Sequence, residues 1–232
     1  MTRVKICGIR EKDHALAAVE AGADFIGLVF APSHRQVTPA EAYEIASTVK
    51  KSSNATEVVG VFVNAPPSQV NKVADLCALD RVQLSGDESW KYCREITRPI
   101  IKAIRIGQQS LEEIYAELSA GSKLLSTQKF TIILDSHVEG KYGGTGVAFD
   151  WNLAQQVARR FQVIVAGGLD PENVAQVIEA VAPWGVDVSS GVEVEGVKDT
   201  AKITAFIEAV RKTEASHASY RAKRGNLDDD KR

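Results

Sequence analysis

Eight short apolar segments recur along the chain, and segments of helical periodicity separate them. They are rich in β-branched residues and nearly continuous rather than alternating, as expected for parallel strands buried on both faces. In chain order they read VKICGI, DFIGLVF, EVVGVFV, RVQLS, PIIKAI, FTIILD, QVIVAG and GVDVSS. A strand pattern that alternates with a helix pattern in this way predicts one parallel β/α fold.

Two of the intervening segments open with a helix-start signal. Thr38 precedes Glu41 by three residues with Pro39 between them, and Ser110 precedes Glu113 in the same way. This spacing predicts a capping box, in which the two side chains satisfy each other's backbone N–H groups. Apolar stripes at helical spacing then predict helices over residues 174–181 and 203–210.

The number of strand–helix cycles and the chain length together favour a closed barrel. The chain has 232 residues, close to the ~250 typical of (βα)₈ barrels, and no linker of biased composition divides it. We therefore predict a single-domain (βα)₈ TIM barrel over residues 1–213, with an open doubly wound sheet as the alternative. Residues 214–232 mix basic and acidic side chains, which indicates a charged extension that is solvated or disordered.

Composition excludes several classes of function. The net charge is −2 and no basic stripe occurs, which argues against a nucleic-acid partner. The apolar runs are far shorter than the ~20 residues of a membrane span. Three cysteines without a C-x-x-C pair argue against a zinc or disulfide framework and for a reducing compartment. We expect a soluble cytoplasmic α/β domain of the size of an enzyme.

In a barrel the chemistry lies where strands end and the following loops begin, so polar residues are interpreted by that position. The seventh strand ends in Gly167 and Gly168, and the eighth ends in Ser189, Ser190 and Gly191. Glycine lets the backbone approach a ligand, and the loops after strands 7 and 8 commonly hold phosphate in this fold. These residues predict a phosphate site, although turn formation alone also explains them.

Cys7 is the only one of the three cysteines at the end of a strand. Cys77 completes an apolar helical stripe and Cys93 has a similar setting, so we predict that both fill the core. A free thiol is only ~3% thiolate at pH 7, so a base role for Cys7 requires positive surroundings that lower its pKa. Core filling is the alternative for Cys7.

Other strand ends carry charged side chains. Arg35 follows the second strand and could hold a substrate carboxylate bidentately, or lie on the surface; His34 beside it is a weaker candidate. Asp135 ends a strongly apolar strand, where partial desolvation would raise its pKa and suit a general acid. Asp187 lies within the eighth strand, and either orients substrate hydroxyls or satisfies neighbouring backbone donors.

Several of these motifs together resemble one enzyme family. KICGI, GLVFAPSHRQV, GVFVN, VQLSGDE, ILDS, GGTG with FDW, AGGL, and GVDVSSGVE followed by GVKD appear in order over about residues 3–210. They are similar to phosphoribosylanthranilate isomerase of tryptophan biosynthesis. The resemblance implies a TIM barrel that carries out an Amadori rearrangement of a phosphorylated aminoaldose to the corresponding ketose, without a cofactor.

The resemblance also implies residue roles. Cys7 is then the general base that removes the proton from C2, and Asp135 the general acid that protonates the ring oxygen. Arg35 matches the position that holds the anthranilate carboxylate, and Asp187 matches an aspartate near the substrate. The implied phosphate loops comprise Gly167, Gly168, Ser190 and Gly191.

One departure and two alternatives accompany this interpretation. The family commonly has histidine where this chain has Ser85, and we predict that activity persists without it. The related phosphoribosyl isomerase of histidine biosynthesis uses two aspartates, and Cys7 argues against it. A non-catalytic barrel that binds a phosphorylated ligand is the alternative from another class. The sequence suggests no obligate partner, so we expect a monomer.

Overall fold

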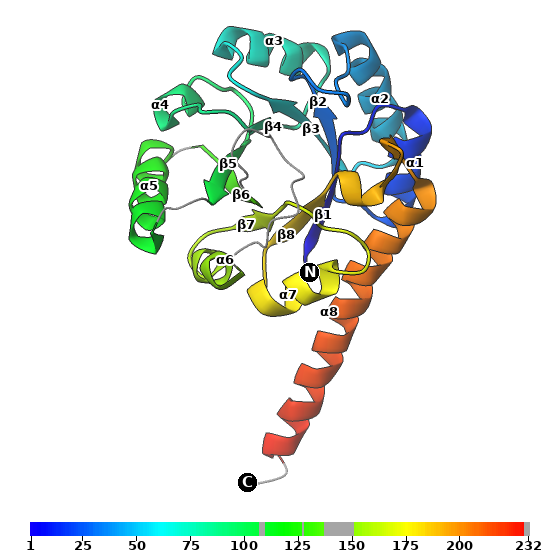
Figure 1. Cartoon of the computed structure of the whole chain (residues 1–232), viewed down its shortest axis with the longest axis vertical. Coiled ribbons are helices and arrows are strands. Elements are labelled where there is room, and N and C mark those ends of the chain that lie inside the picture. Colours follow the sequence, from blue (N-terminus) through cyan, green and yellow to red (C-terminus); the bar gives the residue numbers. More distant parts are fainter. Residues whose placement is uncertain (107–109, 127, 137–150, 230–232) are drawn as a thin grey trace.

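The computed structural model describes residues 1–106, 110–126, 128–136 and 151–229, in which strands and helices alternate (Figure 1). The barrel strands are β1 (Arg3–Cys7), β2 (Phe25–Val29), β3 (Glu57–Phe62), β4 (Arg81–Leu84), β5 (Ile100–Ile106), β6 (Phe130–Ser136), β7 (Val163–Val165) and β8 (Gly185–Val188). The helices are α1 (Lys12–Ala21), α2 (Pro39–Ser52), α3 (Pro67–Leu76), α4 (Trp90–Cys93), α5 (Leu111–Leu124), α6 (Trp151–Ala158), α7 (Val174–Val181) and α8 (Thr200–Asp229). A 3₁₀ turn, η1 (Ser190–Val192), and a short hairpin, β9 (Glu193–Val194) with β10 (Val197–Lys198), follow β8.

Strands β1 to β8 form a closed parallel barrel, because each pairs with the next and β8 pairs with β1. At the closure Val4 of β1 lies opposite Val186 of β8. The predicted (βα)₈ barrel is confirmed. The alternative of an open sheet is wrong, since such a sheet would leave two strand edges unpaired.

Two layers of apolar side chains explain the nearly continuous apolar strands. One set of strand residues faces the surrounding helices, and the alternate set fills the barrel interior. The interior set includes Phe25, Val59, Ile101, Ile133 and Ile164. Because side chains alternate along a strand, the residues of this interior layer show which side chains at the strand ends also point inward.

Both predicted capping boxes are present. The Thr38 hydroxyl accepts a hydrogen bond from the backbone of Glu41, and the Glu41 carboxylate accepts one from the Thr38 backbone at 2.7 Å. Ser110 and Glu113 repeat the arrangement at the start of α5. Each cap supplies acceptors for N–H groups that have no partner inside the helix.

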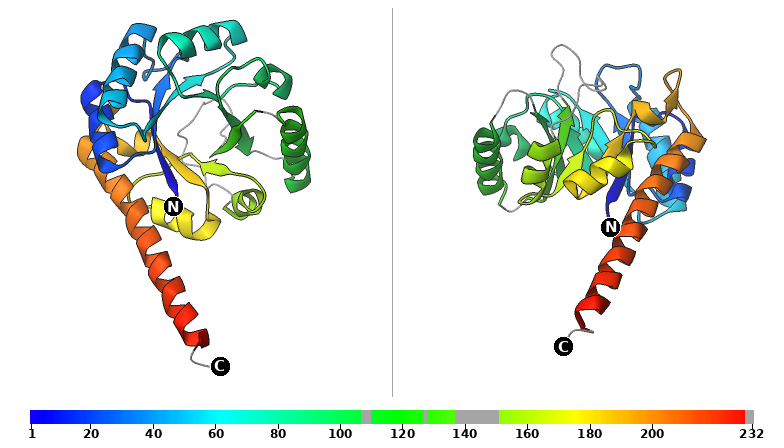
Figure 2. Two further views of the ribbon diagram at one scale, coloured as in Figure 1. Left: turned by 180° about the vertical axis from the view of Figure 1, so that it is seen from behind. Right: turned by 60° about the horizontal axis from the view of Figure 1, so that its bottom comes forward.

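The last helix projects beyond the barrel. The first turns of α8 bury Ile203, Phe206 and Val210 against α1 and α7, and the helix then continues past the barrel on the side of the N-terminus (Figure 2). The predicted boundary at residue 213 falls within this helix. That residues 214–232 form a separate extension stays a prediction.

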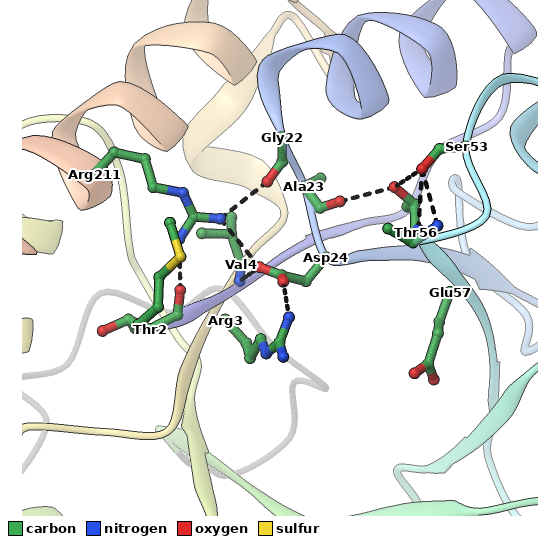
Figure 3. A network of polar contacts seen from close by, with 12 residues as sticks. Thr2, Arg3, Val4, Gly22, Ala23, Asp24, Ser53, Thr56, Glu57 and Arg211 are labelled. Atoms are coloured by element: carbon green, nitrogen blue, oxygen red, sulfur yellow. Dashed lines mark hydrogen bonds and ion pairs between the residues drawn. The ribbon is translucent and has the colours of Figure 1, made fainter.

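A network of polar contacts ties the chain ends together at the amino ends of the strands (Figure 3). The Asp24 carboxylate accepts from Arg3, from the backbone of Val4 at 2.8 Å and from Arg211 of α8 at 3.1 Å. Arg211 also donates to the carbonyl oxygens of Thr2 and Gly22. This network, here called the lower network, joins β1, the turn before β2 and α8.

Candidate active site

Cys7 ends β1 and faces the barrel interior, opposite Gly27 of β2. Its side chain is buried, and its carbonyl oxygen accepts from the Ser189 hydroxyl at 3.1 Å. Burial raises the pKa of the Cys7 thiol; the neighbouring Lys5 ammonium opposes that rise, and Lys198 does so more weakly. The thiol therefore has charged neighbours and is not enclosed by aliphatic side chains.

Gly8 explains how the segment after Cys7 meets its neighbours. Its φ of +79° lies in the left-handed region that favours glycine. A Cβ at this position would lie 2.5 Å from Arg35 Cδ and 3.3 Å from the Ser189 hydroxyl. The absence of a side chain thus allows the stem of Arg35 and the loop after β8 to lie directly beside Cys7.

Arg35 forms a bidentate ion pair with Glu193 of β9. Its Nε and Nη2 donate to the two carboxylate oxygens at 2.7 and 2.8 Å. Lys198 donates to the same carboxylate at 2.6 Å and to the carbonyl oxygen of Ser189 at 2.9 Å. Burial would raise the pKa of Glu193, but Arg35 and Lys198 outweigh it and lower the pKa to about 2. Arg35 is therefore held at the site by a permanent negative charge rather than free on the surface.

The loops after β7 and β8 pack directly on each other. A Cβ on Gly191 would lie 1.9 Å from the carbonyl oxygen of Leu169, so only glycine fits there. Gly167 and Gly168 have φ values of +93° and +66°, and no atom lies within 4 Å of a Cβ built on Gly168. Ser190 begins η1 in the adjoining loop. The predicted phosphate residues thus form one contiguous surface with open space over Gly168.

Asp170 and Asn173 hold the loop after β7 in shape. The Asp170 carboxylate accepts from the backbone of Glu172 and Asn173 at 2.9 and 2.8 Å. The Asn173 amide donates to the carbonyl oxygen of Gly168 at 2.8 Å. These bonds fix the backbone that leads from the glycines into α7.

Asp135 lies one residue before the end of β6. Ile133 belongs to the interior layer, so the alternation along the strand points Asp135 inward as well. Its register partner on β5 is Arg105. The loop that follows, with the GGTG and most of the FDW motif, lies outside the described residues.

Asp187 is buried, and its carboxylate accepts from the Lys5 ammonium at 2.7 Å. This partner is a side chain, whereas the sequence suggested substrate hydroxyls or backbone donors. A substrate-binding role for Asp187 stays a prediction.

Other residues singled out by the sequence lie as follows. Cys77 and Cys93 are fully buried, as predicted. His34 is exposed, and its carbonyl oxygen accepts from Arg10 at 3.0 Å. The Ser85 hydroxyl accepts from the Gln83 amide at 3.0 Å. At the position where the family commonly has histidine, this chain therefore has a hydroxyl group that is hydrogen-bonded to Gln83 of β4.

Three charged residues of this region were missed by sequence reasoning. Lys5 lies inside an apolar strand and was treated as part of it, while Glu193 and Lys198 follow the last strand in a hairpin of two-residue strands. The signal for Lys5 was available, since it shares the inward face with Cys7 two residues later. Glu193 and Lys198 gave no signal except their place in the GVE and GVKD motifs.

A cavity of about 270 Å³ lies at the carboxyl ends of β4 and β5, beside the strand that carries Asp135. Asp87, Trp90, Lys102 and Arg105 are among its lining residues, and none of the predicted site residues lines it. Within the described ranges, no three His, Cys, Asp or Glu side chains gather as a metal site requires. In the same ranges, no helix is long and apolar enough to cross a membrane.

Comparison with known proteins identifies the relatives of this chain. The family model described as N-(5′-phosphoribosyl)anthranilate (PRA) isomerase matches residues 4–209. An N-(5′-phosphoribosyl)anthranilate isomerase of Dehalococcoides mccartyi is 46% identical over 212 residues, with 91% of this chain and 96% of the relative covered. One from a Roseiflexus species is 48% identical over 217 residues, with 91% and 98% covered.

Solved structures agree with this result. The phosphoribosyl anthranilate isomerase of Thermotoga maritima has a TM-score of 0.78 and 37% identity, and the match covers 91% of this chain and all of that one. A structure of phosphoribosyl anthranilate isomerase in complex with reduced 1-(o-carboxyphenylamino)-1-deoxyribulose 5-phosphate has a TM-score of 0.75 and 36% identity, with 91% and 100% covered.

Proposed function

The chain belongs to the N-(5′-phosphoribosyl)anthranilate isomerase family, and we propose that Cys7 and Asp135 are the general base and general acid of its reaction. It is an isomerase of tryptophan biosynthesis that converts N-(5′-phosphoribosyl)anthranilate to 1-(o-carboxyphenylamino)-1-deoxyribulose 5-phosphate. This Amadori rearrangement only relocates protons and opens a ring. One acid and one base, each worth ~10²–10⁴-fold in rate, suffice for such a reaction.

The first step in this proposal is ring opening by Asp135. Its carboxylic acid gives a proton to the furanose oxygen as the bond from that oxygen to C1 breaks, which leaves a Schiff-base cation between C1 and the anthranilate nitrogen. The inward position of Asp135 at the mouth of the barrel supports this role. A partly desolvated carboxyl group holds its proton more firmly, as an acid near neutral pH must.

The second step is proton removal by Cys7. The Schiff-base cation acidifies the hydrogen on C2, so a thiolate is a strong enough base. The thiolate takes this proton and becomes a thiol, and the electron pair of the C2–H bond forms an enolamine that tautomerises to the ketone. Cys7 lies at the end of β1 and Asp135 near the end of β6, three strands away around the barrel, which suits groups that act on one substrate lying between them.

The substrate has two anionic groups, a phosphate and a carboxylate, and each suits a different region of the site. The surface around Gly168 and Gly191 suits the phosphate, as loops after strands 7 and 8 commonly do in this fold. Arg35 suits the anthranilate carboxylate: Glu193 occupies the Nε–Nη2 edge of the guanidinium, and Nη1 takes no part in that pair. A guanidinium has five N–H donors, so it can bind a second carboxylate through its Nη1–Nη2 edge.

The contact at Gly8 is the observation that carries this proposal. One residue without a side chain places the stem of Arg35 and the Ser189 hydroxyl beside the last residue of β1. This arrangement supports the proposal, because the proposed base, carboxylate-binding arginine and phosphate loop must be neighbours to act on a single bound molecule.

The experiment follows anthranilate fluorescence while purified protein acts on phosphoribosylanthranilate. We expect turnover by the parent and losses of at least ~10²-fold in Cys7→Ser and in Asp135→Asn. Cys77→Ser is the matched control, because Cys77 is a buried thiol that donates to the carbonyl oxygen of Pro39 and a serine can do the same. Full activity of Cys7→Ser would contradict the assignment of the base. A folded parent without turnover would instead favour the non-catalytic phosphate-binding barrel.

We also propose that the chain is a cytoplasmic monomer. One relative is dimeric, since a solved structure is of monomers generated from the dimeric phosphoribosylanthranilate isomerase of Thermotoga maritima. Light scattering of the purified protein at twice the 25.1 kDa chain mass would contradict the proposal.

A further inference from the structure

Lys5 is a fully buried charge that the proposed chemistry has not yet used. It lies in the middle of β1, and its side chain has no exposed surface. Lysine is almost never buried to this extent unless it is paired. The alternation along β1 points Lys5 into the barrel, on the same face as Cys7 two residues later.

Asp187 is the partner of Lys5. The two residues lie opposite each other in the pairing of β1 with β8, and the Lys5 ammonium donates to the carboxylate at 2.7 Å. Burial lowers the pKa of Lys5, but the Asp187 carboxylate and Cys7 together more than offset this, so the net pKa is raised and the lysine stays charged. Because desolvation of both charges costs about as much as their attraction returns, stability is a weak reason for the pair.

The position of Gly27 shows what the ammonium lies against. Gly27 of β2 is opposite Cys7, and a Cβ built on it would be 2.9 Å from Cys7 Sγ and 3.1 Å from Lys5 Nζ. The sulfur and the ammonium therefore converge on the same small space, which exists because residue 27 has no side chain. A methyl group there would have to displace one of the two.

The charges around the sulfur come from four elements. Lys5 of β1 and Lys198 of β10 lower the pKa of Cys7, and Asp187 of β8 raises it. Arg35, in the loop after β2, also interacts electrostatically with the thiol. Among these groups Lys5 has the largest effect, and it opposes the larger penalty of burial. Without Lys5, a thiolate would form next to Asp187 with only cations of weaker effect to balance it.

We propose that Lys5 is a positioning residue for the general base: held by Asp187 in the space beside Gly27, its ammonium fixes the Cys7 sulfur and stabilises the thiolate. This inference rests on the proposed function of Cys7. Lys5 keeps its protons throughout: Cys7 loses its proton to water, and the resulting thiolate takes the proton from C2. Asp187 contributes to this arrangement by holding the Lys5 ammonium.

The test measures how the rate at which iodoacetamide modifies Cys7 depends on pH, with the modified peptide quantified by mass spectrometry. Lys5→Met alone would leave Asp187 as a buried unpaired charge, so it is combined with Asp187→Asn. In this double variant we expect the midpoint of the profile to rise by at least about one pH unit, which is a tenfold loss of thiolate at a fixed pH below the midpoint. Asp187→Asn alone keeps a side-chain oxygen that can accept from the Lys5 ammonium and so hold it in place. It removes only the opposing negative charge, so we expect it to lower the midpoint.

Opposite shifts in these two variants distinguish the proposal from a structural role, which would disturb both in the same direction. Lys12→Met is the matched control, because Lys12 forms an exposed pair with Glu44 and its loss should leave the midpoint unchanged. An unchanged midpoint in the folded double variant overturns the proposal. If the double variant does not fold, an unchanged or raised midpoint in Asp187→Asn does so.

Alkylation needs no turnover, so this inference and the proposed function fail separately. An inactive Cys7→Ser together with unmoved midpoints would remove only the role of Lys5. A fully active Cys7→Ser would remove the role of the base, wherever the midpoints lie.

Discussion

The two ends of the barrel contain ion-pair networks of similar chemistry in different surroundings. In the lower network the side chains of Arg3 and Arg211 are 53% and 26% exposed, and they join the chain ends to the barrel (Figure 3). Nearer the carboxyl ends of the strands, Lys5 in the middle of β1 and Lys198 in the hairpin after β8 are 0% and 3% exposed. Partly hydrated pairs cost little desolvation, whereas buried pairs cost several kcal/mol per ion before any attraction is counted. The lower network joins the chain ends to the barrel, and the cost of burying the other pairs supports the proposal that they serve the reaction.

The largest expected difference between the two ends comes from equivalent arginine substitutions. Arg35→Met removes the donors proposed for the substrate carboxylate, so we expect kcat/KM to fall by about 10–10²-fold, mainly through KM, since bonds to charged groups are worth about 1.5–3 kcal/mol each. Arg211→Met at the lower end should leave KM unchanged. Steady-state kinetics on the two variants check this. If Arg35→Met and Arg211→Met changed KM equally, substrate binding could no longer be assigned to one end of the barrel alone.

The second prediction concerns stability at the lower end. Asp24→Asn weakens the acceptor shared by Arg3, Val4 and Arg211, so we expect the free energy of unfolding to fall by about 1–3 kcal/mol. kcat/KM should stay at the parent value, because Asp24 lies at the other end of the strands. Urea unfolding and the fluorescence assay measure the two quantities. If Asp24→Asn instead lowered kcat/KM and left stability unchanged, the lower network would serve the reaction and not the fold.

The smallest effect is expected in how the stability of the fold depends on pH, through Glu193 in the hairpin after β8. The pKa of Glu193 is lowered from 4.5 to about 2, so its pairs stabilise the folded state above pH 4.5 and lose that effect as the pH falls toward 2. Glu193→Gln should therefore lose less stability across this window than the parent does. Thermal unfolding at several pH values checks the slope, with Glu112→Gln, on the exposed first turn of α5, as the control. If the midpoint temperatures of the parent and of Glu193→Gln fell equally with pH, the proposed effect of the Glu193 pairs on stability would be contradicted.

Most of the fold could be predicted from the sequence because its signals are local. The near-continuous apolar strands indicate burial on both faces, and the capping boxes at Thr38 and Ser110 use residues three positions apart. The extent of α8 could not be predicted in this way, because its polar second half lacks an apolar stripe and gave the composition of a solvated tail.

The site was harder to predict, because its electrostatics depend on the register between strands that are distant in sequence. Cys7, Arg35 and Asp187 stood out by type and position. The Lys5–Asp187 pair joins residues 182 positions apart, and only the closure of β8 on β1 brings them together. The pairing of Arg35 with Glu193 likewise depends on the path of a short hairpin, which carries no strong propensity of its own.

The direction of α8 has a practical consequence for handling this enzyme. Its 30 residues extend for about 45 Å at the helical rise of 1.5 Å per residue, and they lead away from the mouth where substrate would enter. A fusion partner or a surface tether attached beyond this helix would stay clear of the entrance. The enzyme could therefore be immobilised or linked to a second catalyst without slowing the diffusion of substrate into the barrel.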